Sequence, residues 1–218
     1  AACVVSGNVR RSARMSILRW SSPSIFKFIS CKSDPSRHWS TNISVEVDNA
    51  FWALVEHGDQ HATRVLEALA EGMLSNGDPG IFNSALASVG ERGDVRSSNP
   101  CGEIALEAWE PCILGHVNLA HPDHQNPEIL AASFAMMARF LMRASLAPSS
   151  DPQQQEIKSI NRRIGVGFFG FQEWLAAQGI RYSQAWQSAS VGEALTDWHG
   201  IVREAADGEA DRLSIARP

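Results

Sequence analysis

One cysteine of this chain lies in a pattern that can do chemistry. Cys101 stands between Pro100 and Gly102, two residues from the amide of Asn99 and two from the carboxylate of Glu103. A proline and a glycine on either side disfavour a helix or a central strand. The stretch therefore predicts a turn that lifts the thiol on a loop.

The carboxylate beside this thiol indicates the kind of chemistry. A nearby negative charge opposes formation of a thiolate, so the pattern suits a nucleophile poorly. A hydrolase would also need a histidine that activates Cys101, and none of the seven histidines lies in a convincing motif. Hydrogen-atom chemistry fits better, because a neutral thiol or a thiyl radical can work beside a carboxylate base. From these five residues alone, a structural cysteine in an ordinary turn is an equally good interpretation.

A second cysteine, Cys112, follows eleven residues after Cys101. Residues 103–106 and 112–119 are strand candidates around a turn at Glu110-Pro111, which allows the two thiols to approach each other. A core cysteine in an apolar strand is the plainer alternative. Cys112 and His116 could share a helix face, but no second pair stands at ligand spacing, so we predict no metal site.

Two further stretches have the residue types of anion-binding loops. Residues 6–13 combine Gly7 with Arg10 and Arg11, and paired arginines can clamp a phosphate or stack on a base. A solvated basic turn is the plainer alternative. Residues 162–167 (Arg-Arg-Ile-Gly-Val-Gly) lack the full dinucleotide-binding glycine pattern, so we expect these glycines to serve close helix packing.

The elements that must position these residues follow from periodicity and caps. Alternation over 42–47 predicts a half-buried strand, and apolar residues at helical spacing predict helices. Strands alternating with helices favour the α/β class. We expect strands at 15–20 and 42–47, and loops at 84–98 and 148–152. Helices are expected from Ser22, after Asp48, from about Gln60 to a turn at 76–80, from about Pro127, and last over 184–206. Residues 165–179 should hold a Gly-rich turn and a helix, with Phe168, Phe171 and Leu175 facing inward.

Composition narrows the class of protein. The 218 residues carry 19 Lys+Arg and 24 Asp+Glu, a formal charge of −5, and no basic run suits duplex nucleic acid. No apolar run is long enough to cross a membrane. Four cysteines without a CxxC pair favour a reducing cytoplasm. Because the chain begins in an apolar run and stops at Pro218 without a terminal element, we expect a fragment truncated at both ends.

Four stretches, taken in this order, resemble ribonucleotide reductase, specifically the adenosylcobalamin-dependent class II enzymes. They lie at residues 6–18, 42–45, 99–119 and 162–170, within a span of roughly 3 to 185. Asn-Pro-Cys-Gly-Glu followed by Cys112 is the most specific of them. This five-residue motif and the close spacing of the two cysteines favour the cobalamin type over the diiron type.

The resemblance implies a ten-stranded α/β barrel, made of two five-stranded halves, with a central finger loop that carries Cys101. Cys101 would become a thiyl radical through homolysis of the cobalt–carbon bond and abstract the 3′ hydrogen of the ribose. Glu103 would take the 3′-hydroxyl proton, and Asn99 would hydrogen-bond the ribose hydroxyls. Cys112 matches one member of the cysteine pair that supplies the reducing equivalents.

The same resemblance implies an allosteric contact and several partners. Residues 7–13 resemble the loop that couples an effector nucleotide to the choice of base, with Gly7, Asn8, Arg10, Arg11 and Ser12 as its candidate contacts. Expected partners are a ribonucleoside di- or triphosphate, a deoxynucleotide or ATP effector, a thioredoxin-like reductant, the remaining parts of the reductase chain, and a second copy of that chain in a homodimer. The choice between diphosphate and triphosphate stays open.

The chain also departs from the family pattern. A partner for Cys112 would lie upstream of residue 1, and Cys3 is too close to the effector-loop stretch to take that place. The family's Ser/Thr-rich phosphate loop, C-terminal cysteine pair and cobalamin-binding segment are not recognisable. We therefore expect residues 1–218 to form a partial barrel domain that is inactive alone. The alternative is a catalytically incomplete piece that only binds a nucleotide or a partner chain.

Overall fold

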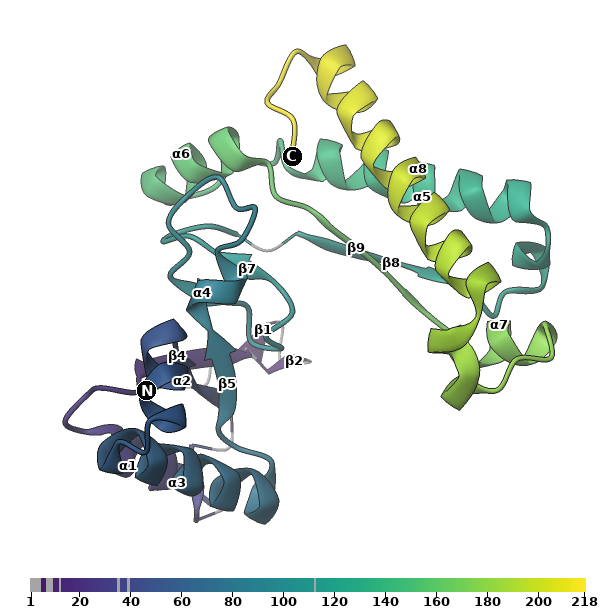
Figure 1. The fold of residues 1–218 in the computed structure, drawn as a ribbon. Coiled ribbons are helices and arrows are strands. Elements are labelled where there is room, and N and C mark those ends of the chain that lie inside the picture. Colours follow the sequence, from purple (N-terminus) through teal and green to yellow (C-terminus); the bar gives the residue numbers. More distant parts are fainter. Residues whose placement is uncertain (1–4, 7–9, 12, 35, 39, 112) are drawn as a thin grey trace. The chain divides into compact units, whose positions relative to one another are not determined.

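A computed structural model describes residues 5, 6, 10, 11, 13–34, 36–38, 40–111 and 113–218 (Figure 1). The chain divides into two compact units, Ala1–Ala108 and Trp109–Pro218. Each unit combines parallel strands with helices. The α/β class predicted from the order of the elements is therefore confirmed.

The first unit is built on a parallel sheet of three strands. They are β3 (Arg14–Arg19), β4 (Thr41–Val47) and β5 (Gly80–Asn83), with β4 in the middle. Ser44 is only 8% exposed although the alternation predicted a polar outer face for it. A central parallel strand is covered on both faces, which the alternation alone does not reveal.

Two helices of the first unit begin at aspartates. The carboxylate of Asp48 accepts the Phe51 N–H at 2.9 Å, and that of Asp59 accepts the Ala62 N–H at 2.9 Å. Each such cap stabilises a helix by about 1 kcal/mol. The capped helices are α2 (Asn49–Glu56) and α3 (Gln60–Asn76), preceded in the chain by α1 (Ile25–Ile29) and the 3-10 turn η1 (Ser30–Lys32).

These helices cover one face of the sheet. Val45 and Val47, two residues apart on β4, point to that face and are fully buried. They pack in one core with residues of all three helices, namely Ile25, Ile29, Phe51, Ala62, Val65 and Leu69. The apolar spacing seen in the sequence therefore places this core correctly.

Several short elements of the first unit differ from the expectations. Residues 80–83 form β5, although the dense turn signal over 76–80 concealed its beginning. The predicted loop over 84–98 contains α4 (Ser84–Ala87) and ends in a two-residue strand. A further antiparallel pair joins β1 (Val5–Ser6) to β2 (Arg10–Arg11). These elements are too short for a periodic pattern to show.

The second unit has a parallel pair, β8 (Leu114–Asn118) and β9 (Gly165–Phe169). The helices α5 (Pro127–Ala144) and α8 (Ala189–Leu213) pack against each other and cross in front of this pair in Figure 1. The Gly-rich turn expected within 165–179 was wrong in its first part, because residues 165–169 extend along β8 as a strand. The last helix also runs seven residues beyond the predicted end at 206 (213 − 206).

One helix of this unit was not predicted. Residues 152–161 form α6 (Pro152–Asn161), directly after the stretch taken for a loop. Its first turn has Pro152 at the first position and the carboxylate of Asp151 as cap, which accepts the N–H groups of Gln153 and Gln154. The remaining elements are η2 (Pro122–Gln125), α7 (Phe171–Ala177) and η3 (Tyr182–Gln187).

Aromatic rings form the centre of the second core. Trp198 of α8 lies 5.0 Å from Trp174 and 5.2 Å from Phe134, measured between ring centroids. Leu175 is fully buried as expected, whereas Phe168 remains 36% exposed even though its ring touches Trp198. Among the described residues, none of the helices has both the length and the apolar character needed to cross a membrane.

Candidate active site

Cys101 lies at the tip of a β-hairpin in the first unit. The strands β6 (Ser97–Ser98) and β7 (Ala105–Leu106) pair antiparallel, and residues 99–104 connect them. The cysteine is a free thiol and is exposed. The expectation that the thiol is lifted on a loop is therefore confirmed.

The tight turn at the tip has a clear local cause. The N–H of Gly102 donates to the carbonyl of Asn99 at 2.9 Å, which closes a four-residue turn with Pro100 at its second position. Gly102 itself has a φ of +86°, a conformation that costs a residue with a side chain energy. Pro100 and Gly102 are thus the residue types that this turn requires.

Asn99 forms the base of the loop. It is 6% exposed, and its backbone N–H donates to the carbonyl of Ile104 at 3.2 Å. Its side-chain oxygen accepts the N–H of Ile104 at 3.0 Å, which ties the two ends of the loop together. The amide oxygen therefore has a structural role in closing the loop.

Glu103 is exposed, like Cys101 two residues before it. The hairpin thus brings the three predicted catalytic residues onto one loop, with Asn99 buried at its base and both reactive groups open to a ligand. This arrangement allows a carboxylate to accept a proton next to a thiol that exchanges a hydrogen atom.

A residue not proposed for the site holds the loop from outside. The side-chain NH₂ of Asn42, the second residue of β4, donates to the carbonyl of Pro100 at 2.5 Å. Asn42 lies in the stretch 42–45 that carried part of the family resemblance. That position was the only signal in the sequence, because an asparagine at the start of a strand is otherwise unremarkable.

Cys112 lies outside the described residues, so its proximity to Cys101 stays a prediction. Among the described residues, β7 pairs with β6 and β8 pairs with β9. Glu110, two residues earlier, is buried and accepts hydrogen bonds from Asn161 at 2.9 Å and Arg163 at 2.8 Å. Ile113, one residue later, accepts the Gly165 N–H at 2.9 Å.

The expected effector contacts are only partly within the described chain. Gly7, Asn8 and Ser12 lie outside it, whereas Arg10 and Arg11 form β2 opposite β1. The assignment of these residues to a nucleotide stays a prediction.

Gly167, one of the two glycines of residues 162–167, has a packing role as expected, but toward a strand. A side chain at Gly167 would come within 2.8 Å of the ring of His116 on the neighbouring β8. The predicted contact with a helix was therefore wrong for Gly167. No group of three or more potential metal-ligating side chains gathers within the part of the chain that the structure describes.

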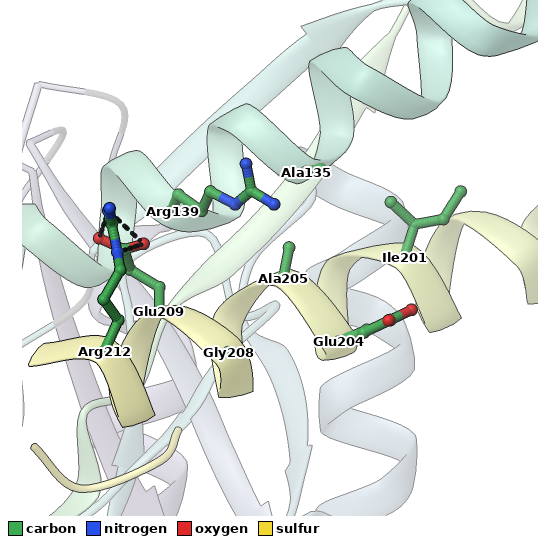
Figure 2. Close-up of a pocket in the computed structure, with 8 residues that line it drawn as sticks. All are labelled: Ala135, Arg139, Ile201, Glu204, Ala205, Gly208, Glu209 and Arg212. Carbon is green, nitrogen blue, oxygen red and sulfur yellow. Dashed lines mark hydrogen bonds and ion pairs between the residues drawn. The ribbon is translucent and has the colours of Figure 1, made fainter. Parts of the chain in front are cut away.

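A groove of about 640 Å³ lies between α5 and α8 in the second unit (Figure 2). The carboxylate of Glu209 lies at one end, bound by Arg212 at 2.8 Å and by Arg143 of α5 at 2.7 Å. The hydrogen bond from Arg212, together with the charges of both arginines, lowers the pKa of Glu209, against the opposite effect of its burial. The groove contains none of the predicted catalytic residues, and Glu209 serves to join the two helices.

The chain is similar to known proteins of one kind. Residues 59–194 match the family model "Ribonucleotide reductase, barrel domain". A putative adenosylcobalamin-dependent ribonucleoside-triphosphate reductase of Mycobacterium phage D29 is 44% identical, over 100% of this chain and 33% of that protein. The adenosylcobalamin-dependent ribonucleoside-triphosphate reductase of Lactobacillus leichmannii is 36% identical, over 79% of this chain and 23% of that protein.

Two further similarities concern a diphosphate enzyme and a solved structure. The vitamin B12-dependent ribonucleoside-diphosphate reductase of Mycobacterium tuberculosis is 33% identical, over 84% of this chain and 29% of that protein. The alpha subunit of the class Id ribonucleotide reductase of Actinobacillus ureae has the same fold, with a TM-score of 0.70 and 18% identity, over 91% of this chain and 41% of that one. This chain therefore spans a third or less of the length of these sequence relatives.

Proposed function

This chain belongs to the ribonucleotide reductase family, as part of its barrel domain, and on that premise we propose that it carries the radical cysteine and the general base of a reductase. The reaction is the conversion of ribonucleotides to 2′-deoxyribonucleotides for DNA synthesis. The observation that supports the proposal is the hairpin tip, where Cys101 is exposed and free with Glu103 two residues away. In the complete enzyme, this hairpin is the finger loop of a ten-stranded barrel.

Each residue of the loop has one task. The Cys101 thiyl radical takes the 3′ hydrogen of the ribose, and the carboxylate of Glu103 takes the proton of the 3′-hydroxyl. The NH₂ of Asn99 donates to a ribose hydroxyl, because its oxygen is bound to Ile104. Loss of the 2′-hydroxyl as water then consumes two electrons and two protons, which Cys112 and a second thiol supply by forming a disulfide. Cys101 finally returns the hydrogen atom to C3′, which restores its thiyl radical, and Glu103 returns the proton to the 3′-oxygen. A thioredoxin-like reductant restores the two thiols.

The cofactor that we infer is adenosylcobalamin, because the sequence relatives are named as dependent on it. The described site fits it at one place, the exposed thiol of Cys101, whose hydrogen atom is accessible. When bound, this cofactor supplies the carbon radical that removes that hydrogen atom. Relatives named for triphosphates and for diphosphates are both similar to this chain, so the assay below includes both substrates.

The test uses a complete reductase that carries these 218 residues, either the reading frame around them or the phage D29 relative with its matching third replaced. With adenosylcobalamin and a dithiol, we expect deoxynucleotide formation that stops when the cofactor is left out. Cys101→Ser should abolish it, whereas Cys31→Ser, a change at the other free cysteine among the described residues, should leave it intact. Full activity of Cys101→Ser would overturn the proposal.

A further inference from the structure

The hydrogen bonds of the finger loop, residues 99–103, are of two kinds. Those between Gly102 and Asn99, between Asn99 and Ile104, and from the Ser98 hydroxyl to the Asn99 carbonyl all join residues 98–104 to one another. They determine the shape of the loop. They do not determine where the loop stands relative to the parallel sheet of the first unit.

Only one hydrogen bond with a stated distance joins this loop to another element among the described residues. It runs from the Asn42 NH₂ to the Pro100 carbonyl, the peptide group that directly precedes Cys101. A bond at this carbonyl limits rotation about the backbone on the amino-terminal side of the cysteine. The position of the thiol therefore depends on where Asn42 stands.

Asn42 lies on the middle strand of the parallel sheet. It is paired with Met15 of β3 in the register of the central sheet. The next residue, Ile43, donates its N–H to Asp78 at 3.5 Å, and Asp78 forms an ion pair with Lys32 at 2.5 Å, with the lysine side chain only 12% exposed. The beginning of β4 is thus held from both sides, and a side chain on it gives the loop a fixed reference point.

We propose that Asn42 is a positioning residue for Cys101, fixing the thiol relative to the sheet through the Pro100 carbonyl. The catalytic part of this inference rests on the proposed reductase function. Hydrogen-atom transfer requires the reacting atoms to be in close contact, and a misplacement of about 1 Å can cost roughly 10²-fold in rate. Loss of the Asn42 bond therefore lowers turnover more than it lowers substrate affinity.

The positioning role is tested on the 218-residue chain by a distance measurement that does not depend on enzymatic activity. A nitroxide on Cys101 and a second one on exposed Glu56→Cys report the distance between the loop and α2, a helix that packs against β4. The measurement is double electron–electron resonance, in a background where the other cysteines are serine. Asn42→Leu keeps the branched shape and loses the donor, so we expect a broader distance distribution. Asn42→Gln keeps the donor and should narrow the distribution again, and Thr41→Val, next to it on β4, should leave it unchanged.

The catalytic consequence is tested in the complete reductase. Asn42→Leu should lower kcat by about 10- to 100-fold with KM changed less than about threefold, and Asn42→Gln should recover part of kcat. An unchanged distance distribution in Asn42→Leu overturns the positioning role, and so does an unchanged kcat. If the unsubstituted complete reductase makes no deoxynucleotide, the proposed function fails, and the distance measurement still decides the role of Asn42.

Discussion

At the scale of single residues, the reactive groups of the finger loop and the groups that hold its shape belong to different residues. Cys101 and Glu103 are exposed, whereas Asn99 is buried and its side-chain oxygen accepts a hydrogen bond from Ile104 within the loop. The support comes from residue types with backbone consequences, above all Gly102 with its positive φ. Substitutions at these positions therefore have different consequences.

Glu103→Gln removes the base and keeps the size of the side chain. We expect kcat of the complete reductase to fall by about 10²- to 10⁴-fold, the usual contribution of a general base. KM should change little, because the amide still fits the site. Steady-state kinetics measure this, with Glu67→Gln on the exposed side of α3 as the control for the same change of charge. A kcat equal to that of the control would remove Glu103 from the reaction.

Gly102→Ala tests the turn. A side chain at Gly102 meets no atom within 4 Å, so the cost comes from the φ of +86° alone. We expect a loss of about 1–2 kcal/mol in the free energy of unfolding of the first unit, measured by urea denaturation. Gly208→Ala is the control, because Gly208 also has open space but lies inside α8, where alanine should add roughly 0.5–1 kcal/mol to the second unit. Equal effects of the two changes would contradict the argument from φ.

At the scale of elements, two buried contacts join helices to their neighbours. The aromatic cluster around Trp198 packs α8 against α5 and α7. Glu209, whose side chain is 3% exposed, connects α8 to Arg143 of α5. Only the second of these contacts depends on pH.

The lowered pKa of Glu209 has a defined sign. The folded state favours the carboxylate, so its contribution to stability is complete above the ordinary value of 4.5 and disappears as the pH falls through the lowered folded-state pKa. Glu209→Gln should therefore lower the urea midpoint at pH 7, and the difference from the parent chain should shrink toward pH 3. Glu204→Gln on the same helix is the control and should leave the midpoint nearly unchanged at both pH values. A difference that stays constant with pH would show that charge is not the cause.

At the scale of the whole molecule, the sheets are small. The described residues form one parallel sheet of three strands and one parallel pair, and no closed barrel among them. Parallel strands normally belong to larger sheets covered on both faces. Together with a span of a third or less of the sequence relatives, this fits a part of the barrel domain that the family model describes.

The isolated chain is therefore expected to be inactive. With adenosylcobalamin, a dithiol and either ribonucleoside triphosphate or diphosphate, the 218 residues alone should form no deoxynucleotide above a blank without protein. The complete reductase that carries them should do so under the same conditions, as measured by chromatography of the products. Turnover by the isolated chain would refute this expectation.

The sequence by itself determined the features that depend on neighbours along the chain. Asp48 caps a helix as expected, because the N–H group that its carboxylate accepts is only three positions away, and the same holds for Asp59. The turn at Cys101 follows from Pro100 and Gly102 for the same reason. The family resemblance also rested on short stretches of fixed wording, and residues 59–194 match the family model.

Only the tertiary structure decided the features that depend on distant partners. Residues 165–169 form a strand because they pair with β8, about fifty residues earlier in the chain. Their glycines made a turn look more plausible than a strand in the sequence. Ser44 is buried because β4 lies between two strands, and Asn42 reaches Pro100 across fifty-eight residues of sequence. Hydrogen bonds and burial of this kind depend on which distant segments meet in space. The periodicity of residues within one segment cannot reveal those contacts.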